Sequence, residues 1–168
     1  MIDARESREL RAVVLAIANV DKTLRKMIRQ FTKAMAAPEF QKAMAARATT
    51  RLEQRALVDT SVVTVSDRNV RMQSASKGRP LSGGFNPKTD YAAAEWGGDK
   101  NRRTTATRRG RGGYTHKVTE PMPSNLKGRS RTGHVFGPAS RAMVARIGRL
   151  WAQTAVRTIA TALEGKQE

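Results

Sequence analysis

The stretch TSVVTVSDRNVRMQSAS (residues 60–76) decides the fold class, because the hydrophobic period changes there from helical spacing to alternation. Apolar and polar residues alternate on both sides of the short polar sequence DRN at residues 67–69. Two alternating runs joined by a short polar turn predict a β-hairpin over residues 60–76. Two strands alone are only marginally stable in water, so we expect a third strand from this chain or from a neighbouring subunit.

The sequence before the hairpin has the three-four spacing of amphipathic helices. Apolar residues form one stripe over residues 2–36, Asp3 and Glu6 resemble a capping box, and Pro38 ends the run. We therefore predict one long helix over residues 2–36 and a second, weaker helix over residues 38–58. Both stripes are typical of a hydrophobic core. The length of the first helix leaves a subunit interface as the alternative.

Regular periodicity largely disappears between residues 77 and 137, where Gly, Pro, Ser, Thr and Asn dominate. This stretch carries 13 cationic and 4 acidic residues, so its net charge of +9 is half of the chain's +18. We expect a long basic loop or arm here, interrupted by a short helical turn near residues 91–96 and a strand over residues 114–119. Pro138 then begins a C-terminal helix over residues 138–165.

These elements predict a single α+β domain over residues 1–168. In chain order it has a long N-terminal helix, a second helix, a small antiparallel sheet, the basic arm, and a C-terminal helix packed on the sheet. A chain of 168 residues has room for one core, or for one core with a long arm.

Catalytic and metal-binding patterns are not found in the sequence. There is no cysteine, and the two histidines, His116 and His134, have no acidic residue at ligand spacing. Neither a P-loop nor a Gly-x-Ser-x-Gly sequence occurs. No run approaches the roughly 18 apolar residues of a membrane span, and charges occupy the N-terminus where a signal peptide needs an apolar stretch. We therefore predict a soluble, non-secreted protein without enzyme activity, metal, cofactor or membrane contact.

Cationic side chains make the arm the strongest candidate for binding a polyanion or a partner protein. The candidate residues are Lys100, Arg102, Arg103, Arg108, Arg109, Arg111, Lys117, Lys127, Arg129 and Arg131. Guanidinium groups bind phosphate or carboxylate oxygens in pairs, and glycines allow close backbone approach. Three interpretations stay open: docking on acidic surfaces within an assembly, which we favour, contact with a polyanion, and a solvated loop. With only Tyr114 interleaved, stacking on single-stranded bases has little support.

Three short sequences carry a resemblance to a known family: VDTSVVTVSDRNVRM at the hairpin, YAAAEWG at residues 91–97, and VFGPA at residues 135–139. With these sequences in this order along it, the chain resembles the tail-completion (putative tail-component) neck proteins of long-tailed bacteriophages. The matching positions are Tyr91, Ala92, Glu95, Trp96, Gly97, Phe136, Pro138 and Ala139. Two features depart from the family pattern, namely the start of the first strand at residues 59–62 and the longer, more basic arm over residues 99–132.

The resemblance implies a structural virion protein that forms a homo-oligomeric ring at the junction of head and tail. Such a protein would be made in the host cytoplasm and would end in the virion. Its neighbours would be an adaptor, a stopper, a tail terminator or a tail tube, and the genome would pass nearby with non-specific DNA contact. The arm would then be extended and would order against neighbouring subunits or DNA. The alternative is a free-standing nucleic-acid-binding protein that acts through its Arg/Gly-rich arm, without sequence specificity.

Overall fold

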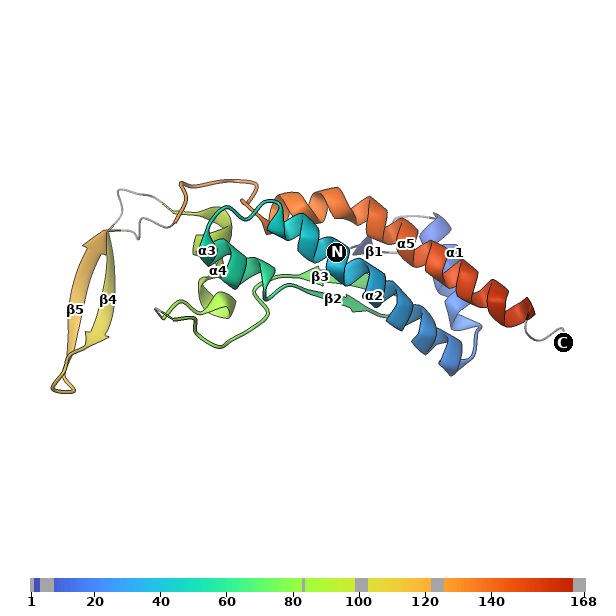
Figure 1. Ribbon diagram of the computed structural model, residues 1–168, viewed down its shortest axis with the longest axis horizontal. Coiled ribbons are helices and arrows are strands. Elements are labelled where there is room, and N and C mark those ends of the chain that lie inside the picture. The colour runs from blue at the N-terminus through green and yellow to red at the C-terminus, as the bar shows by residue number, and fades with distance from the viewer. Residues whose placement is uncertain (1, 4–7, 83, 99–102, 122–125, 165–168) are drawn as a thin grey trace.

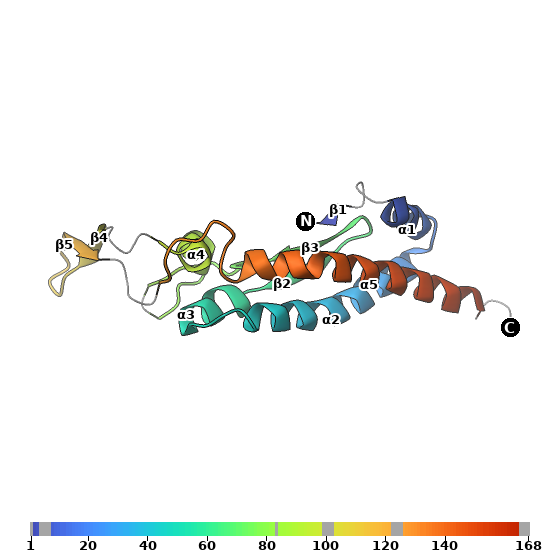
Figure 2. The same ribbon diagram turned by 90° about the horizontal axis from the view of Figure 1, so that it is seen from above.

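The computed structural model describes residues 2–3, 8–82, 84–98, 103–121 and 126–164. The elements are β1 (Ile2–Asp3), α1 (Arg8–Ala18), α2 (Lys22–Ala45), α3 (Arg51–Glu53), a π-helical turn η1 (Gln54–Val58), β2 (Val62–Val65), β3 (Asn69–Gln73), α4 (Pro87–Trp96), β4 (Arg103–Arg109), β5 (Thr115–Pro121) and α5 (Phe136–Glu164). Helices α2 and α5 run side by side along the long axis, and β4 and β5 lie beyond α4 at one end (Figures 1 and 2). This arrangement confirms the predicted α+β class.

The single long helix predicted over residues 2–36 is two helices in the structure. α1 ends at Ala18, and α2 begins at Lys22 after Asp21, whose side chain accepts a hydrogen bond from the Thr23 N–H at 3.2 Å. This bond and the backbone N–H of Lys22 lower the pKa of the Asp21 carboxyl. The apolar stripe continues across the break, so periodicity alone predicted one helix. Asp3 lies in β1 rather than in a helix cap, and Glu6 lies outside the described residues.

Pro38 does not end a helix, which corrects the predicted boundary between the first two helices. It lies inside α2, with its side chain exposed to solvent. Proline in a helix interior loses one backbone hydrogen bond and costs about 3 kcal/mol. The buried face of α2 continues on both sides of Pro38, with Ala36 and Phe40 both inaccessible to solvent. Tertiary packing of that face therefore overrides the local preference of proline.

The second predicted helix, over residues 38–58, is also interrupted. α2 ends at Ala45, and Thr50 begins α3 with a capping box in which its side chain and that of Glu53 accept hydrogen bonds reciprocally. The chain then widens into the π-helical turn η1, which buries Ala56, Leu57 and Val58. A cap formed by two polar residues thus starts a new helix inside a weak apolar stripe.

The predicted hairpin forms at β2 and β3, which pair antiparallel with Val65 opposite Val70. The third strand is β1, which pairs with β3 through Ile2 opposite Val70, so the sheet order is β1-β3-β2. The chain therefore supplies the partner strand itself. Strand β2 packs on α2 and β3 packs on α5, which places the sheet against the helix pair as predicted.

The core lies between α2, α5 and the sheet. Its largest fully buried side chains include Trp151, Phe40, Ile28 and Ile147. α5 begins two residues before the predicted start, and Phe136 in its first turn meets Phe40 edge to face, with ring centroids 6.1 Å apart. Among the described residues, no helix is long and apolar enough to cross a membrane.

Candidate functional site

The carboxylate of Glu95 holds the first turn of α5. Its Oε2 accepts hydrogen bonds from the backbone N–H groups of Val135 at 3.3 Å and Phe136 at 2.8 Å, and its Oε1 accepts one from Gly137 at 2.8 Å. Glu95 is 2% exposed. The first N–H groups of a helix have no partner within the helix, and an anion there is also stabilised by the helix dipole. Glu95 is therefore a structural cap of α5.

Two of the three sequences that carry the family resemblance meet at this cap. Tyr91, Ala92, Glu95 and Trp96 lie on α4, Gly97 ends that helix, and Phe136, Pro138 and Ala139 form the first turn of α5. Only Glu95 contacts the other sequence through its side chain in the hydrogen bonds described here. The rings of Tyr91 and Trp96 contact one another, with centroids 5.6 Å apart, and both are partly exposed. Of these residues, Glu95 holds the start of α5.

Gly97 and the segment that follows the arm fit closely together. Gly97 has a φ of +68°, and a Cβ there would collide with the carbonyl oxygens of Lys127 and Gly128. Gly98 donates a hydrogen bond from its N–H to the Lys127 carbonyl at 3.1 Å, and Ser130 does the same to the Trp96 carbonyl at 2.8 Å. The returning chain is therefore held against the end of α4.

Lys127, which we predicted as part of a polyanion- or partner-binding arm, is paired within the protein. Its ammonium lies 2.7 Å from Oε1 of Glu53, a carboxylate that is nearly inaccessible to solvent. Burial raises the pKa of Glu53, but the hydrogen bond from Lys127 and those from the Thr49 and Thr50 N–H groups outweigh it, so the net pKa is lowered. Lys127 therefore stabilises the fold and is removed from the candidate binding residues.

The predicted extended arm is a β-hairpin for much of its length, which corrects the prediction of a loop with a single strand. β4 and β5 pair antiparallel over seven residue pairs, from Arg103 opposite Pro121 to Arg109 opposite Thr115. The turn spans residues 110–114, where the Tyr114 ring lies over Gly110 and also contacts His116, with ring centroids 5.7 Å apart. We predicted only the second of these strands, because Thr and Arg in the first do not alternate with apolar residues.

One face of this hairpin is polar over the three residue pairs nearest the turn, before the pair of Arg103 and Pro121 at the open end. Residues directly opposite each other in a strand pair lie on the same face. This face contains Thr105, Thr107 and Arg109 of β4 and Thr115, Lys117 and Thr119 of β5. All six side chains are exposed, and Thr105 and Thr119 share a hydrogen bond between their hydroxyls at 3.0 Å. We name these six residues the hydroxyl–cation face.

The remaining cations of the predicted site are scattered. Arg111 lies in the exposed turn, and Arg129 and Arg131 are exposed on the returning segment near α4. Arg103 and Arg108 lie in β4, where the structure describes their backbone. Lys100 and Arg102 lie outside the described residues. Among the described cations, the hairpin therefore brings together Arg109, Arg111 and Lys117.

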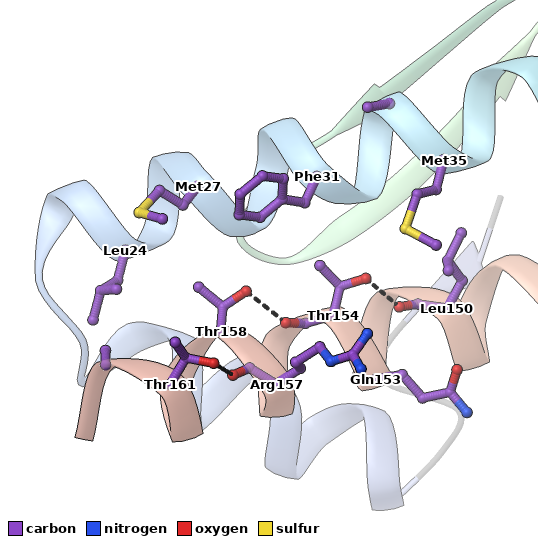
Figure 3. Close-up of a pocket in the computed structure, with 12 residues that line it drawn as sticks. Leu24, Met27, Phe31, Met35, Leu150, Gln153, Thr154, Arg157, Thr158 and Thr161 are labelled. Atoms are coloured by element: carbon purple, nitrogen blue, oxygen red, sulfur yellow. Dashed lines mark hydrogen bonds between the residues drawn. The ribbon is translucent and has the colours of Figure 1, made fainter. Parts of the chain in front are cut away.

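An apolar groove between α2 and α5 was not predicted from the sequence. It measures about 710 Å³ and is lined by Leu24, Met27, Phe31 and Met35 of α2 and by Leu150, Thr154, Thr158 and Thr161 of α5 (Figure 3). Phe31 and Met35 are 49% and 52% exposed. The apolar stripe over residues 2–36 was assigned to the core, with a subunit interface as the alternative. The width of the apolar stripe was the feature of the sequence that could have predicted the groove, because the stripe covers more of the helix surface than packing against one partner requires.

The threonines of the groove present methyl groups rather than free hydroxyls. Thr154, Thr158 and Thr161 each donate a hydrogen bond to the carbonyl four residues earlier in α5, at 2.7 to 3.0 Å. Their hydroxyls are thus satisfied within the helix, as the dashed lines in Figure 3 show. Among the residues that the structure describes, Arg157 is the one charged residue that lines the groove. The surface therefore favours apolar packing over hydrogen bonding to a polar ligand.

Together these features define a small basic α+β protein with an apolar groove and a projecting cationic hairpin. Within the described part of the chain, no group of three or more His, Cys, Asp or Glu side chains is placed to hold a metal ion. No protein-family model, no curated protein and no solved structure matches the chain.

Proposed function

We propose that the protein is a structural subunit of the neck between the head and the tail of a phage. Copies bind one another through two unlike surfaces, the subunit arrangement called head-to-tail, and form a ring that connects the head connector to the tail. The proposal takes the family from the short sequences described above. Its main physical support is the pair of unlike apolar surfaces on opposite sides of α5.

The first surface is the α2–α5 groove, and the second is a ridge formed by Ala152, Val156, Ala160 and Leu163. Val156 and Leu163 are 63% and 62% exposed. Val156 follows Thr154 by two residues, which turns its side chain about 200° around the helix, away from the groove. A head-to-tail ring requires two different, complementary surfaces on each subunit. A concave and a convex apolar surface on one chain meet that requirement.

The low charge of the groove and the ridge permits contact between copies despite their mutual repulsion. Copies that each carry +18 repel one another, so they can approach closely only through surfaces with few charges. The groove has a single charged lining residue, Arg157, and the ridge residues are uncharged. Charged residues are also depleted from the centres of protein interfaces in general.

Light scattering on wild-type protein and two single variants tests the head-to-tail arrangement. Phe31→Glu places a charge in the groove, and Val156→Glu places one on the ridge; both positions are exposed, so the fold should persist. We expect wild type to self-associate with rising concentration and each variant to stay monomeric. Gln30→Glu, an exposed substitution on α2 outside the groove lining, is the matched control and should associate like wild type.

Mixing the two variants distinguishes a head-to-tail contact from a two-fold one. In the mixture, the intact groove of Val156→Glu can bind the intact ridge of Phe31→Glu, but no further copy can add. The expected product is a dimer of twice the 18.5 kDa chain mass. If the mixture stays monomeric, or if wild type is monomeric at all concentrations, ring formation through these surfaces is wrong.

The position in the particle needs a separate test. In the virus that encodes the chain, antibodies against the protein should label the head–tail junction in electron micrographs of complete particles. Particles made without the protein should contain heads and tails that do not join. Labelling elsewhere, or normal joining without the protein, contradicts the assignment to the neck.

A further inference from the structure

We infer that the hydroxyl–cation face of the β4–β5 hairpin binds the phosphate backbone of duplex DNA without sequence preference. This deepens the proposed function by assigning a ligand to the hairpin. The binding itself is a property of each chain and does not require ring formation.

The composition of the face matches a phosphate site. Phosphate oxygens in protein–DNA complexes are bound mainly by Arg and Lys, by Ser and Thr hydroxyls and by backbone N–H groups. Four threonines, one arginine and one lysine form this face, and Arg111 adds a cation at the turn. The hairpin, residues 103–121, contains five cationic residues and one acidic residue, Glu120, which pairs with Thr104 and so belongs to the other face. Arg109, Arg111 and Lys117 make no ion pair with any residue that the structure describes.

The lack of apolar side chains on the hydroxyl–cation face favours nucleic acid over an acidic protein surface as its ligand. The centres of protein–protein interfaces are rich in aromatic and apolar side chains, whereas none of the six residues of this face is apolar. His116 and Val118 alternate with Thr115 and Lys117 along β5 and belong to the other face. The apolar docking surface of the protein is the groove, which is formed by different elements.

Shape favours a duplex over a single strand. A two-stranded β-ribbon is narrow enough to enter the major groove of B-DNA. Single-strand binding depends on aromatic platforms for the bases, and the one exposed aromatic ring near the turn, Tyr114, already lies against His116. In Figures 1 and 2, the hairpin stands clear of the helices, so a duplex can reach both strands.

Fluorescence anisotropy with a labelled duplex of about 30 base pairs measures this binding. Three phosphate contacts give a log–log salt slope of about −2.7, or a roughly 40-fold loss of affinity between about 50 and 200 mM salt. The triple variant Arg109→Gln, Arg111→Gln, Lys117→Gln should lose most of that slope. Lys26→Gln, Lys33→Gln, Arg149→Gln removes the same charge from exposed positions on the helices and is the matched control. Equal losses in both triple variants would overturn the inference, because attraction would then be spread over the whole surface.

The hydroxyls are tested by a second variant that keeps every charge. Changing Thr105, Thr107 and Thr119 to valine preserves β-branched side chains and the charge of the hairpin. We expect about a 10-fold lower affinity with an unchanged salt slope, because neutral hydrogen bonds are lost and no counterions are involved. Wild-type affinity in this variant would overturn the assignment of this face.

The rival ligand is an acidic protein, and polyglutamate of matched charge is its probe. Wild type should prefer the duplex, and the hairpin charge variant should remove that preference. Preference for polyglutamate would assign the hairpin to a protein partner instead. Since light scattering without DNA tests ring formation, failure of DNA binding and failure of the ring remain distinguishable.

Discussion

Replacing Glu95 with alanine should destabilise the protein more than any other single carboxylate change at an ion pair or helix cap described here. The substitution removes the acceptor of three backbone N–H groups at the start of α5. The N–H of Val135, a fully buried residue, cannot regain water, whereas Phe136 and Gly137 are partly exposed. An orphaned buried donor costs about 1–3 kcal/mol, and a partly hydrated one costs less. We expect a loss of about 4 kcal/mol, a large part of the roughly 5–15 kcal/mol that stabilises a domain.

Urea unfolding followed by circular dichroism measures this free energy. Glu95→Gln keeps one oxygen acceptor but loses the charge at the helix N-terminus, so we expect about 2 kcal/mol. Glu39→Ala is the matched control, because Glu39 pairs with Arg146 at an exposed site and should cost less than about 1 kcal/mol. A loss below about 1 kcal/mol for Glu95→Ala, or one equal to that of the control, would refute the assigned role of the cap.

Three further predictions concern stability. Gly97→Ala should lower stability by about 3 kcal/mol in thermal unfolding, because of the positive φ and the collision with the Lys127 and Gly128 carbonyls; a neutral effect would contradict that packing. Pro38→Ala should raise stability by about 1–2 kcal/mol, because alanine restores a helix hydrogen bond at an exposed site; a loss would show that proline is favoured there. The pKa of Glu53 is lower in the folded protein than in the unfolded chain, so its carboxylate stabilises the fold at pH values above the ordinary glutamate pKa of about 4.3. This stabilisation is lost as the pH falls through the pKa of Glu53 in the folded protein. Unfolding free energy between about pH 5 and pH 3 should therefore fall more steeply in wild type than in Glu53→Gln, and equal slopes would disprove the linkage.

The candidate surfaces were only partly predictable. Positive charge, glycine content and the lack of a core marked residues 77–137 as a binding segment, and Arg109, Arg111 and Lys117 do lie together on the hairpin. Lys127 has the same charge but a different role, because its partner Glu53 lies 74 positions earlier in the chain. Sequence spacing cannot reveal such a pair. The groove was not predicted because the sequence pattern of apolar residues is the same whether their side chains face a core or the solvent.

Local chemistry in the sequence determined the α+β class, the β2–β3 hairpin and the C-terminal helix. Alternation, helical spacing and turn residues act between near neighbours and are visible in one dimension. Contacts between distant segments decided the rest. Packing of Ala36 and Phe40 carries α2 through Pro38, β1 reaches across to β3, and Glu95 caps a helix that begins 41 residues later. These features depend on burial and on hydrogen bonds that form only when the chain has folded, so the tertiary structure alone shows them.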